Sequence, residues 1–215
     1  MKNEYLDLAC AEKAEGMAAY MKNRFVFMGL PKPIRQPLEK KWKQILKPQT
    51  VSELKSNVNF LWDQPEREFH MFVLEYLKTN QKLLSPQNLN WLQKIFLKNT
   101  WWDSIDLLAS NVLGGVLERN TEAQAEMDQW IVHDNFWIRR CALIFQLRYK
   151  ENTDWLRLQN YILHCIDEKE FFIKKAIGWS LREYAKTNPD KVLQFVHSEN
   201  RLSPLSKREA LKHLK

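Results

Sequence analysis

The stretch Phe171-Phe172-Ile173-Lys174-Lys175 begins a long amphipathic segment, and two similar aromatic pairs begin earlier segments of the same kind. The three pairs are Trp101-Trp102, Phe136-Trp137 and Phe171-Phe172, and each follows the one before it by 35 residues. A repeat of this length is typical of stacked helical hairpins. The spacing therefore predicts a helical repeat protein, with Phe136 and Phe171 packed between neighbouring hairpins.

The rest of the chain fits the same architecture. Apolar residues recur at the spacing of a helix face, and no segment alternates as a strand would. Hairpins are expected at about 50–80, 86–119, 122–150 and 155–186, with further helices in 189–215, after an N-terminal helical region at about 9–46. Gly29 to Pro33 interrupt that region, because glycine and proline break helices. We expect a single all-α domain over residues 1–215, a HEAT-like α-solenoid with a basic concave face.

Several short patterns predict where helices begin. Thr50-Val51-Ser52-Glu53 and Ser206-Lys207-Arg208-Glu209 fit the capping box, in which a hydroxyl and a carboxylate satisfy opposing backbone donors. Ser85-Pro86 and Asn188-Pro189 place a capping residue before a proline, which suits the first turn of a helix.

The positive charge of the chain is concentrated in its last third. The formal net charge is +7. Residues 136–215 hold 16 Lys and Arg against 9 Asp and Glu, so this part alone carries +7, while residues 1–135 hold 17 of each kind. Such asymmetry indicates nucleic acid or another anionic surface as a partner. The alternative is a basic surface that only keeps the protein in solution.

Cysteine usage and hydropathy bear on the compartment. Cys10, Cys141 and Cys165 are odd in number and lack CxxC spacing, so reduced thiols are expected, with Cys141 and Cys165 in the core. The first residues lack the apolar centre of a signal peptide, and no stretch is long and apolar enough to cross a bilayer. These features predict a cytoplasmic protein without membrane association.

Superposing the repeats predicts where chemistry could occur. Trp102 and Asp106 are four residues apart and share one helix face. The same alignment brings the corresponding positions of the later repeats to that side of the solenoid: Arg140, Lys175, Trp179 and Arg182. Cations can hold phosphates, indoles attract a cationic sugar or base, and a carboxylate can stabilise a developing cation or orient water. This combination suits cleavage of an N-glycosidic bond in a cationic nucleotide. The alternative is that the Trp residues are core, the Asp is a helix-terminal residue and the Lys face solvent.

Other kinds of chemistry lack their motifs. The five histidines show no metal-ligand spacing, and the chain has no CxxC, Walker loop, GxGxxG or GxSxG pattern. We therefore expect neither a metal nor a cofactor.

The chain also resembles the bacterial alkylpurine DNA glycosylases of the AlkD type along almost its full length. The resembling stretches lie at 13–23, 61–69, 101–106, 145–150, 175–186 and 205–210. The resemblance implies a HEAT-like fold that cups DNA and releases N3- or N7-alkylated purines without a metal. It implies Asp106 as the catalytic carboxylate and Trp102 and Trp179 as aromatic walls beside the lesion sugar.

The DNA contacts rest partly on the same resemblance. It implies Arg140 as a phosphate contact, with Tyr20 and Arg182 as further contacts. Lys175 joins them from the repeat alignment, and Arg148 lies in one of the resembling stretches. The expected partner is alkylated double-stranded DNA, bound by a monomer. Two rivals stay open: a HEAT-like module that binds DNA backbone or branched DNA without cleaving it, and a scaffold whose basic groove holds an acidic protein.

Overall fold

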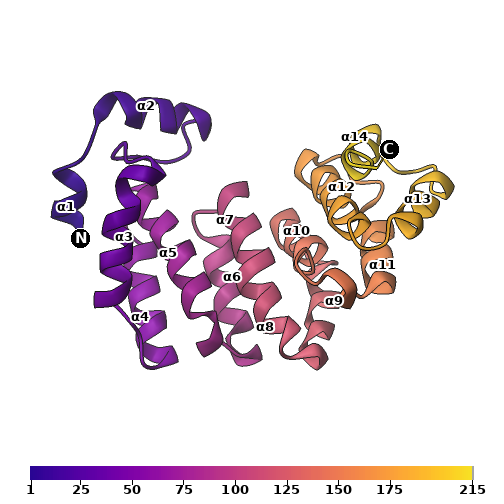
Figure 1. Cartoon of the computed structure of the whole chain (residues 1–215), viewed down its shortest axis with the longest axis horizontal. Coiled ribbons are helices and arrows are strands. Elements are labelled where there is room, and N and C mark those ends of the chain that lie inside the picture. Colours follow the sequence, from indigo (N-terminus) through magenta and orange to yellow (C-terminus); the bar gives the residue numbers. More distant parts are fainter. Residues whose placement is uncertain (215) are drawn as a thin grey trace. The chain divides into compact units, whose positions relative to one another are not determined.

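The computed structural model describes residues 1–214, and the regular elements in that range are helices. Among these residues, β-type pairing is limited to an isolated bridge between Val26 and Glu66. The prediction of an all-α helical repeat protein is confirmed. The chain forms two compact units, Met1–Leu84 and Ser85–Lys215, drawn in Figure 1 from indigo to yellow. The expectation of a single domain stays a prediction.

The first unit contains five α-helices and a short 3-10 turn within the described residues. They are α1 (Lys2–Leu6), α2 (Ala11–Tyr20), α3 (Lys32–Ile45), α4 (Val51–Trp62), α5 (Arg67–Asn80) and the turn η1 (Gln81–Leu83). The hairpin α4–α5 and the helices α2 and α3 occupy the predicted ranges, while α1 lies before them. Thr50 caps α4 by accepting a hydrogen bond from the Glu53 amide at 3.2 Å.

The predicted break between α2 and α3 depends on a glycine. Gly29 has φ of +83°, and a Cβ at this position would lie 2.0 Å from the Cys10 carbonyl oxygen. The buried carboxylate of Glu68 holds the turn by accepting the amides of Met28, Gly29 and Leu30 at 2.9 to 3.1 Å. A side chain larger than hydrogen at Gly29 therefore cannot fit without moving the loop.

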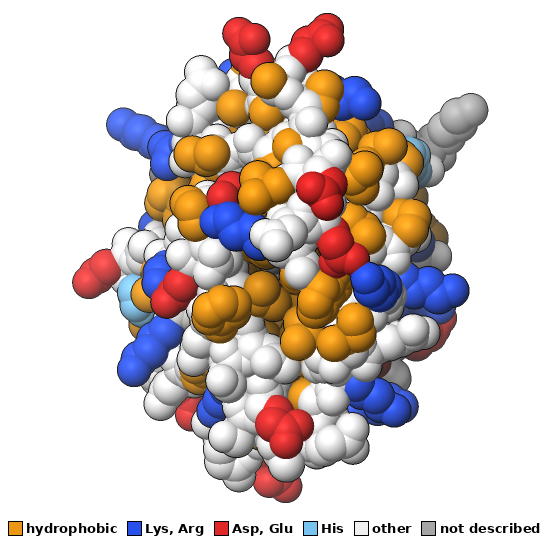
Figure 2. Space-filling model, turned by 90° about the vertical axis from the view of Figure 1, so that its left-hand side faces the viewer, with side chains coloured by type: hydrophobic (Ala, Val, Ile, Leu, Met, Phe, Trp, Pro, Cys, Tyr) orange, Lys and Arg blue, Asp and Glu red, His pale blue; other side chains and the backbone are white. Residues whose placement is uncertain are grey.

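One face of the first unit is partly apolar. Figure 2 shows the molecule from the side of α1 and α3, where hydrophobic side chains gather among charged ones. A cavity of about 290 Å³ in this unit is lined by Trp42, Leu46, Phe60 and Phe69, among others.

The second unit contains the rest of the described helices. They are η2 (Pro86–Asn88), α6 (Leu89–Leu97), α7 (Trp102–Leu107), η3 (Leu108–Leu113), α8 (Gly114–Glu118), η4 (Thr121–Ala125), α9 (Glu126–Trp130), α10 (Phe136–Ile144), η5 (Lys150–Asn152), α11 (Trp155–Cys165), α12 (Phe171–Ala185), α13 (Pro189–Ser198) and α14 (Pro204–Ala210). The run α7–η3–α8 is one helix with a π-helical centre. It packs on α10, which packs on α12, which in turn packs on α14.

Hydrogen bonds between neighbouring repeats span numbers of residues equal or close to the period of 35 found in the sequence. The Tyr149 hydroxyl donates to the Gly114 carbonyl across 35 residues, and the Tyr161 hydroxyl donates to Asp128 across 33. Arg157 donates to Gln124 across 33 residues as well. The side chains that join one hairpin to the next thus recur with the repeat, as a stacked array requires.

The aromatic pairs pack differently from the prediction. Trp101, Trp137 and Phe172 form a cluster, with ring centroids 4.8 to 5.8 Å apart. Phe136 is half-buried against Trp137. Phe171 is 54% exposed, so the prediction that it fills the space between hairpins is wrong. Its neighbour Phe172 faces the cluster instead, because successive helical residues point about 100° apart.

One predicted capping box is also wrong. Helix α14 begins at Pro204, and Ser203 caps it by accepting the Ser206 amide at 3.1 Å. Ser206 is therefore inside the helix, where its hydroxyl donates to the Lys174 carbonyl of α12. Glu209, the presumed capping carboxylate, faces α12 as well. A proline one residue after a serine marked the true start.

Candidate functional site

Asp106 lies in the last turn of the short helix α7. The helix starts at Trp102, where the Ser104 hydroxyl accepts the Trp101 amide at 3.3 Å and donates to the Trp101 carbonyl at 2.9 Å. Trp102 is half-buried on the same helix, four residues before Asp106. This spacing places the indole and the carboxylate on one face of α7, as predicted.

The structure joins Asp106 to Arg140 of α10. Arg140 Nε donates to Asp106 Oδ1 at 2.8 Å, and Nη2 donates to Oδ2 at 2.9 Å. Nη1 of the same guanidinium donates to the Phe172 carbonyl of α12. We call Asp106, Arg140 and this carbonyl the Asp106 cluster. A bidentate pair fixes both the position and the plane of the carboxylate.

The two partners of the pair differ in exposure. The Arg140 side chain is 4% exposed, whereas that of Asp106 is 20% exposed. Each of the three guanidinium nitrogens of Arg140 donates a hydrogen bond within the protein. Arg140 is therefore not an exposed cation in this structure. Its expected contact with a DNA phosphate stays a prediction, while its contact with the carboxylate is direct.

Burial and Arg140 act in opposite directions on the acidity of Asp106. Removal from water raises the pKa of the Asp106 carboxyl above its ordinary value, and the Arg140 guanidinium opposes that rise. The nearby charge of Asp103 adds slightly to the raised pKa. Arg140 therefore favours the ionised form of the carboxylate, whereas burial and Asp103 disfavour it.

A π-helical segment follows Asp106 directly, and the sequence patterns did not predict it. Within η3 the Ser110 hydroxyl donates to the Asp106 carbonyl at 2.6 Å, and the Asn111 amide donates to the Leu107 carbonyl at 3.1 Å. These side chains satisfy carbonyls that the altered helix geometry offers. Segments of this kind occur frequently at functional sites.

Two other predicted cations share one carboxylate. Lys175 Nζ lies 3.0 Å from Glu209 Oε1, and Arg182 Nη1 lies 2.6 Å from Glu209 Oε2. We call these three residues the Glu209 cluster. Lys175 is 39% exposed and Arg182 is 18% exposed, against 14% for Glu209. The two cations hold the pKa of Glu209 below its ordinary value, with Lys175 as the largest cause.

Glu209 lies where α12 and α14 pack closely against each other. Gly178 of α12 approaches α14 so closely that a Cβ there would lie 2.5 Å from the Glu209 Cβ and 2.8 Å from the Ser206 carbonyl oxygen. Sequence reasoning missed Glu209 as a site residue because its pattern with Ser206 resembled a helix cap. The glycine between Lys175 and Arg182 was the available signal for a close helix contact.

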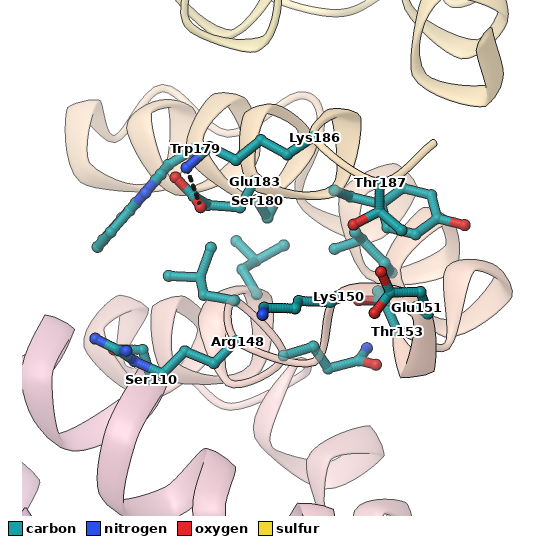
Figure 3. Close-up of a pocket in the computed structure, with 15 residues that line it drawn as sticks. Ser110, Arg148, Lys150, Glu151, Thr153, Trp179, Ser180, Glu183, Lys186 and Thr187 are labelled. Atoms are coloured by element: carbon teal, nitrogen blue, oxygen red, sulfur yellow. Dashed lines mark hydrogen bonds and ion pairs between the residues drawn. The ribbon is translucent and has the colours of Figure 1, made fainter. Parts of the chain in front are cut away.

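Trp179 and Arg148 line one cavity of about 590 Å³ in the second unit. We call it the Trp179 cavity. Its walls come from η3, from the end of α10 with the following residues to Thr153, from α11, and from the second half of α12. In Figure 3 Trp179 descends from α12, and Arg148 extends along the opposite wall. Ser110 also lines this cavity, one turn after Asp106.

Tyr20, predicted as a DNA contact, ends α2 in the first unit and is exposed. Its role stays a prediction.

Over residues 1–214 no group of three or more His, Cys, Asp or Glu side chains is arranged to hold a metal ion. In the same part of the chain, no helix has the length and apolar character needed to span a membrane. Cys141 and Cys165 are free and buried, as expected.

Comparison with known proteins places these features in a family. Comparison with curated proteins gives no match. The solved structure of a predicted DNA alkylation repair enzyme from Enterococcus faecalis is 33% identical, with a TM-score of 0.90 and 96% of each chain covered. Two structures from Streptococcus mutans share the fold. The first, smu.31 of strain UA159, has 17% identity and a TM-score of 0.62, covering 86% of this chain and 99% of that chain. The second, AlkD2, has 16% identity and a TM-score of 0.63, covering 93% and 98%.

The family model described as DNA alkylation repair enzyme matches residues 1–214. This match extends over both units of the chain. It confirms the AlkD-type resemblance found in the sequence, and the chain belongs to the DNA alkylation repair enzyme family.

Proposed function

We propose that the protein is a DNA glycosylase that hydrolyses the N-glycosidic bond of cationic N3- and N7-alkylated purines in duplex DNA. The observation that carries the proposal is the Asp106 cluster. It offers a carboxylate that is partly exposed and is fixed by a guanidinium that is itself buried. A surface built only to bind phosphates has no use for a carboxylate that is more exposed than the cation that holds it.

The reaction needs few groups because the leaving base already carries a positive charge. When the bond between the sugar C1′ and the purine nitrogen breaks, its electron pair neutralises the purine. The sugar is left as an oxocarbenium-like centre. The Asp106 carboxylate stabilises that centre and orients the water that adds to C1′. The water loses one proton to solvent, and the products are a neutral alkylpurine and an abasic site. No general acid is required.

Arg140 and the two indoles have separate roles in this scheme. Arg140 holds Asp106 in place, because it supplies both hydrogen bonds to the carboxylate, and it opposes the effect of burial on the pKa of that group. Trp102 precedes Asp106 by one helical turn and offers its π face to the cationic sugar. Trp179 is the second aromatic wall beside the sugar. It lies on α12 and lines the Trp179 cavity.

The proposal is tested with purified protein and methylated duplex DNA. We expect free 3-methyl- or 7-methylpurine to be released above the rate in buffer alone, as measured by chromatography. Unmethylated duplex is the matched control and should release no base. Salt-dependent binding without release would favour a non-catalytic DNA-binding module. Absence of both binding and release would favour a protein scaffold.

A further inference from the structure

Some cations of the second unit already form an ion pair with a carboxylate, and others do not. Arg140 is bound to Asp106, and both Lys175 and Arg182 are bound to Glu209. An arriving phosphate must compete with those carboxylates. Arg148 and Lys150 differ, because within residues 1–214 no hydrogen bond or ion pair engages either side-chain cation. Both are exposed, and both line the Trp179 cavity.

The segment that carries these two cations is held firmly at both ends. Before Lys150, the buried Tyr149 hydroxyl donates to the Gly114 carbonyl at 2.7 Å. After it, the Asp154 amide donates a hydrogen bond to the side chain of Gln146 at 2.7 Å, and Asp154 caps α11. Lys150 itself has φ of +51°, a left-handed conformation that is uncommon for lysine. A fixed backbone reduces the conformational entropy that this segment loses on binding an anion.

The lining of the cavity combines polar and charged residues with apolar ones. Its lining includes four residues with hydroxyl side chains, Ser110, Thr153, Ser180 and Thr187. Figure 3 shows the Lys150 side chain extending along the cavity from the wall opposite α12, on the same side as Arg148. A volume of about 590 Å³ lies within the range of clefts that enclose small ligands, and it leaves room for a nucleotide segment.

Two carboxylates moderate the charge of the cavity without cancelling it. Glu183 pairs with Lys186 at 2.7 Å, so those two charges are balanced. Glu151 offsets one of the two remaining cations, Arg148 and Lys150. The lining therefore keeps a formal excess of one positive charge. The cavity itself reaches to one helical turn from Asp106, because Ser110 lines it while its hydroxyl contacts the Asp106 carbonyl.

We propose that the Trp179 cavity is a phosphodiester-binding site, in which Arg148 and Lys150 hold the backbone of the DNA strand beside the nucleotide on which Asp106 acts. The identity of the ligand as DNA rests on the proposed function. The proposal makes Lys150 a binding residue. It also assigns the first phosphate contacts to this cavity rather than to Lys175 and Arg182, whose charges Glu209 already engages.

The test compares variants that remove one positive charge each. Lys150→Asn keeps a residue that tolerates the left-handed backbone, and Arg148→Gln keeps hydrogen-bonding capacity. Binding of an undamaged duplex is measured by fluorescence anisotropy across salt concentrations of about 50 to 200 mM. Each variant should reduce the log–log salt slope by about 0.9. The double variant should lose about tenfold or more in affinity at the middle of this range.

Two control variants sharpen the result, one with the same change in charge and one with the opposite change. Lys191→Asn removes an exposed lysine of α13 that does not line the cavity, and it should leave the slope close to that of the parent. Glu151→Gln removes the unbalanced carboxylate and should tighten binding. A parent-like slope in the Arg148 and Lys150 variants, or an equal loss in Lys191→Asn, overturns the proposal.

The outcome is separable from that of the proposed function. Base release from methylated duplex is measured in the same variants under single-turnover conditions with saturating protein. If the parent releases no base but the cavity variants still lose their salt slope, the glycosylase proposal fails and the cavity proposal stands. If base is released and the slopes are unchanged, the cavity proposal alone fails.

Discussion

The Asp106 cluster and the Glu209 cluster contain the same kinds of charged groups in opposite arrangements. In the Asp106 cluster one carboxylate meets one guanidinium, so the formal charge is zero, and the anion is the more exposed partner. In the Glu209 cluster one carboxylate meets two cations, so the formal charge is +1, and both cations are more exposed than the anion. The first cluster presents negative charge outward, which suits a developing cation. The second presents positive charge, which suits a phosphate.

Asp106→Asn should break the first cluster with the largest effect. The substitution keeps the shape of the side chain but removes the charge that stabilises the oxocarbenium-like centre. Loss of one preorganised electrostatic group of this kind costs about 10²–10³ in rate. We therefore expect base release in single-turnover assays to fall by that factor, with DNA affinity unchanged or slightly higher. A parent-like rate in these assays would make the carboxylate structural and remove the proposed mechanism.

Arg140→Gln should lower the rate less and change its pH dependence. Without the guanidinium, burial and the charge of Asp103 act on Asp106 unopposed, so its pKa rises further and the ionised form is lost at a higher pH. The acid limb of the single-turnover pH profile should move to higher pH. The rate near neutrality should fall by roughly 10- to 100-fold, because the carboxylate also loses its orientation.

The neighbouring Arg139 supplies the matched control for that variant. Arg139 forms a similar two-point pair with Glu168, at 2.8 and 2.7 Å, and does not contact Asp106. Arg139→Gln should leave the acid limb where it is in the parent protein. If Arg140→Gln also leaves the limb unmoved, Arg140 does not set the ionisation of Asp106.

The sequence predicted the repeat and one half of the Asp106 cluster, and physical reasons account for the rest. Periodicity identifies which residues share a helix face, so Trp102 and Asp106 on α7 were predictable. It also placed Arg140 on the same side as Asp106. Periodicity alone does not reveal which charged groups meet between helices, because that depends on the packing distance. Arg140 was therefore expected to face phosphate, whereas it reaches the carboxylate.

Local patterns failed where a tertiary contact overrode them. The pattern from Ser206 to Glu209 has the residues of a capping box, but Ser203 before Pro204 starts the helix and releases Glu209 to face α12. The π-helical segment after Asp106 has no strong sequence signal either. Phe171 and Phe172 are chemically alike, and only the direction of α12 decides which of them packs.

Gly178→Ala should disturb the Glu209 cluster and leave the Asp106 cluster intact. The added methyl group would meet the Glu209 Cβ and the Ser206 carbonyl oxygen at less than 3 Å, so α14 must shift away from α12. Overpacking of this kind costs about 1–3 kcal/mol. We expect a lower melting temperature, measured by circular dichroism, with the rate of base release at saturating protein close to that of the parent. A proportional loss of rate would mean that the two clusters are coupled through α12.

Glu209→Gln should have the smallest effect. Unlike most changes in a binding site, it should raise the affinity for DNA. The amide keeps the size of the side chain and one acceptor but no longer neutralises part of the charge of Lys175 and Arg182. Those cations then become available to a backbone phosphate. A single partly screened charge near the surface is worth about 1 kcal/mol, so affinity for undamaged duplex should rise by roughly three- to tenfold. The log–log salt slope should become steeper by up to about 0.9.

The control for Glu209→Gln must change the net charge equally and elsewhere. Glu168→Gln does so, because Glu168 is also a partly buried carboxylate in an arginine pair of the second unit and its partner Arg139 is not a predicted DNA contact. A rise in affinity confined to Glu209→Gln would indicate that the Glu209 cluster faces the DNA. An equal rise in both variants would reduce the effect to net charge. Weaker binding in Glu209→Gln alone would mean that the carboxylate holds the two cations in place for the phosphate, so that both clusters use an ion pair to position the charge that meets the substrate.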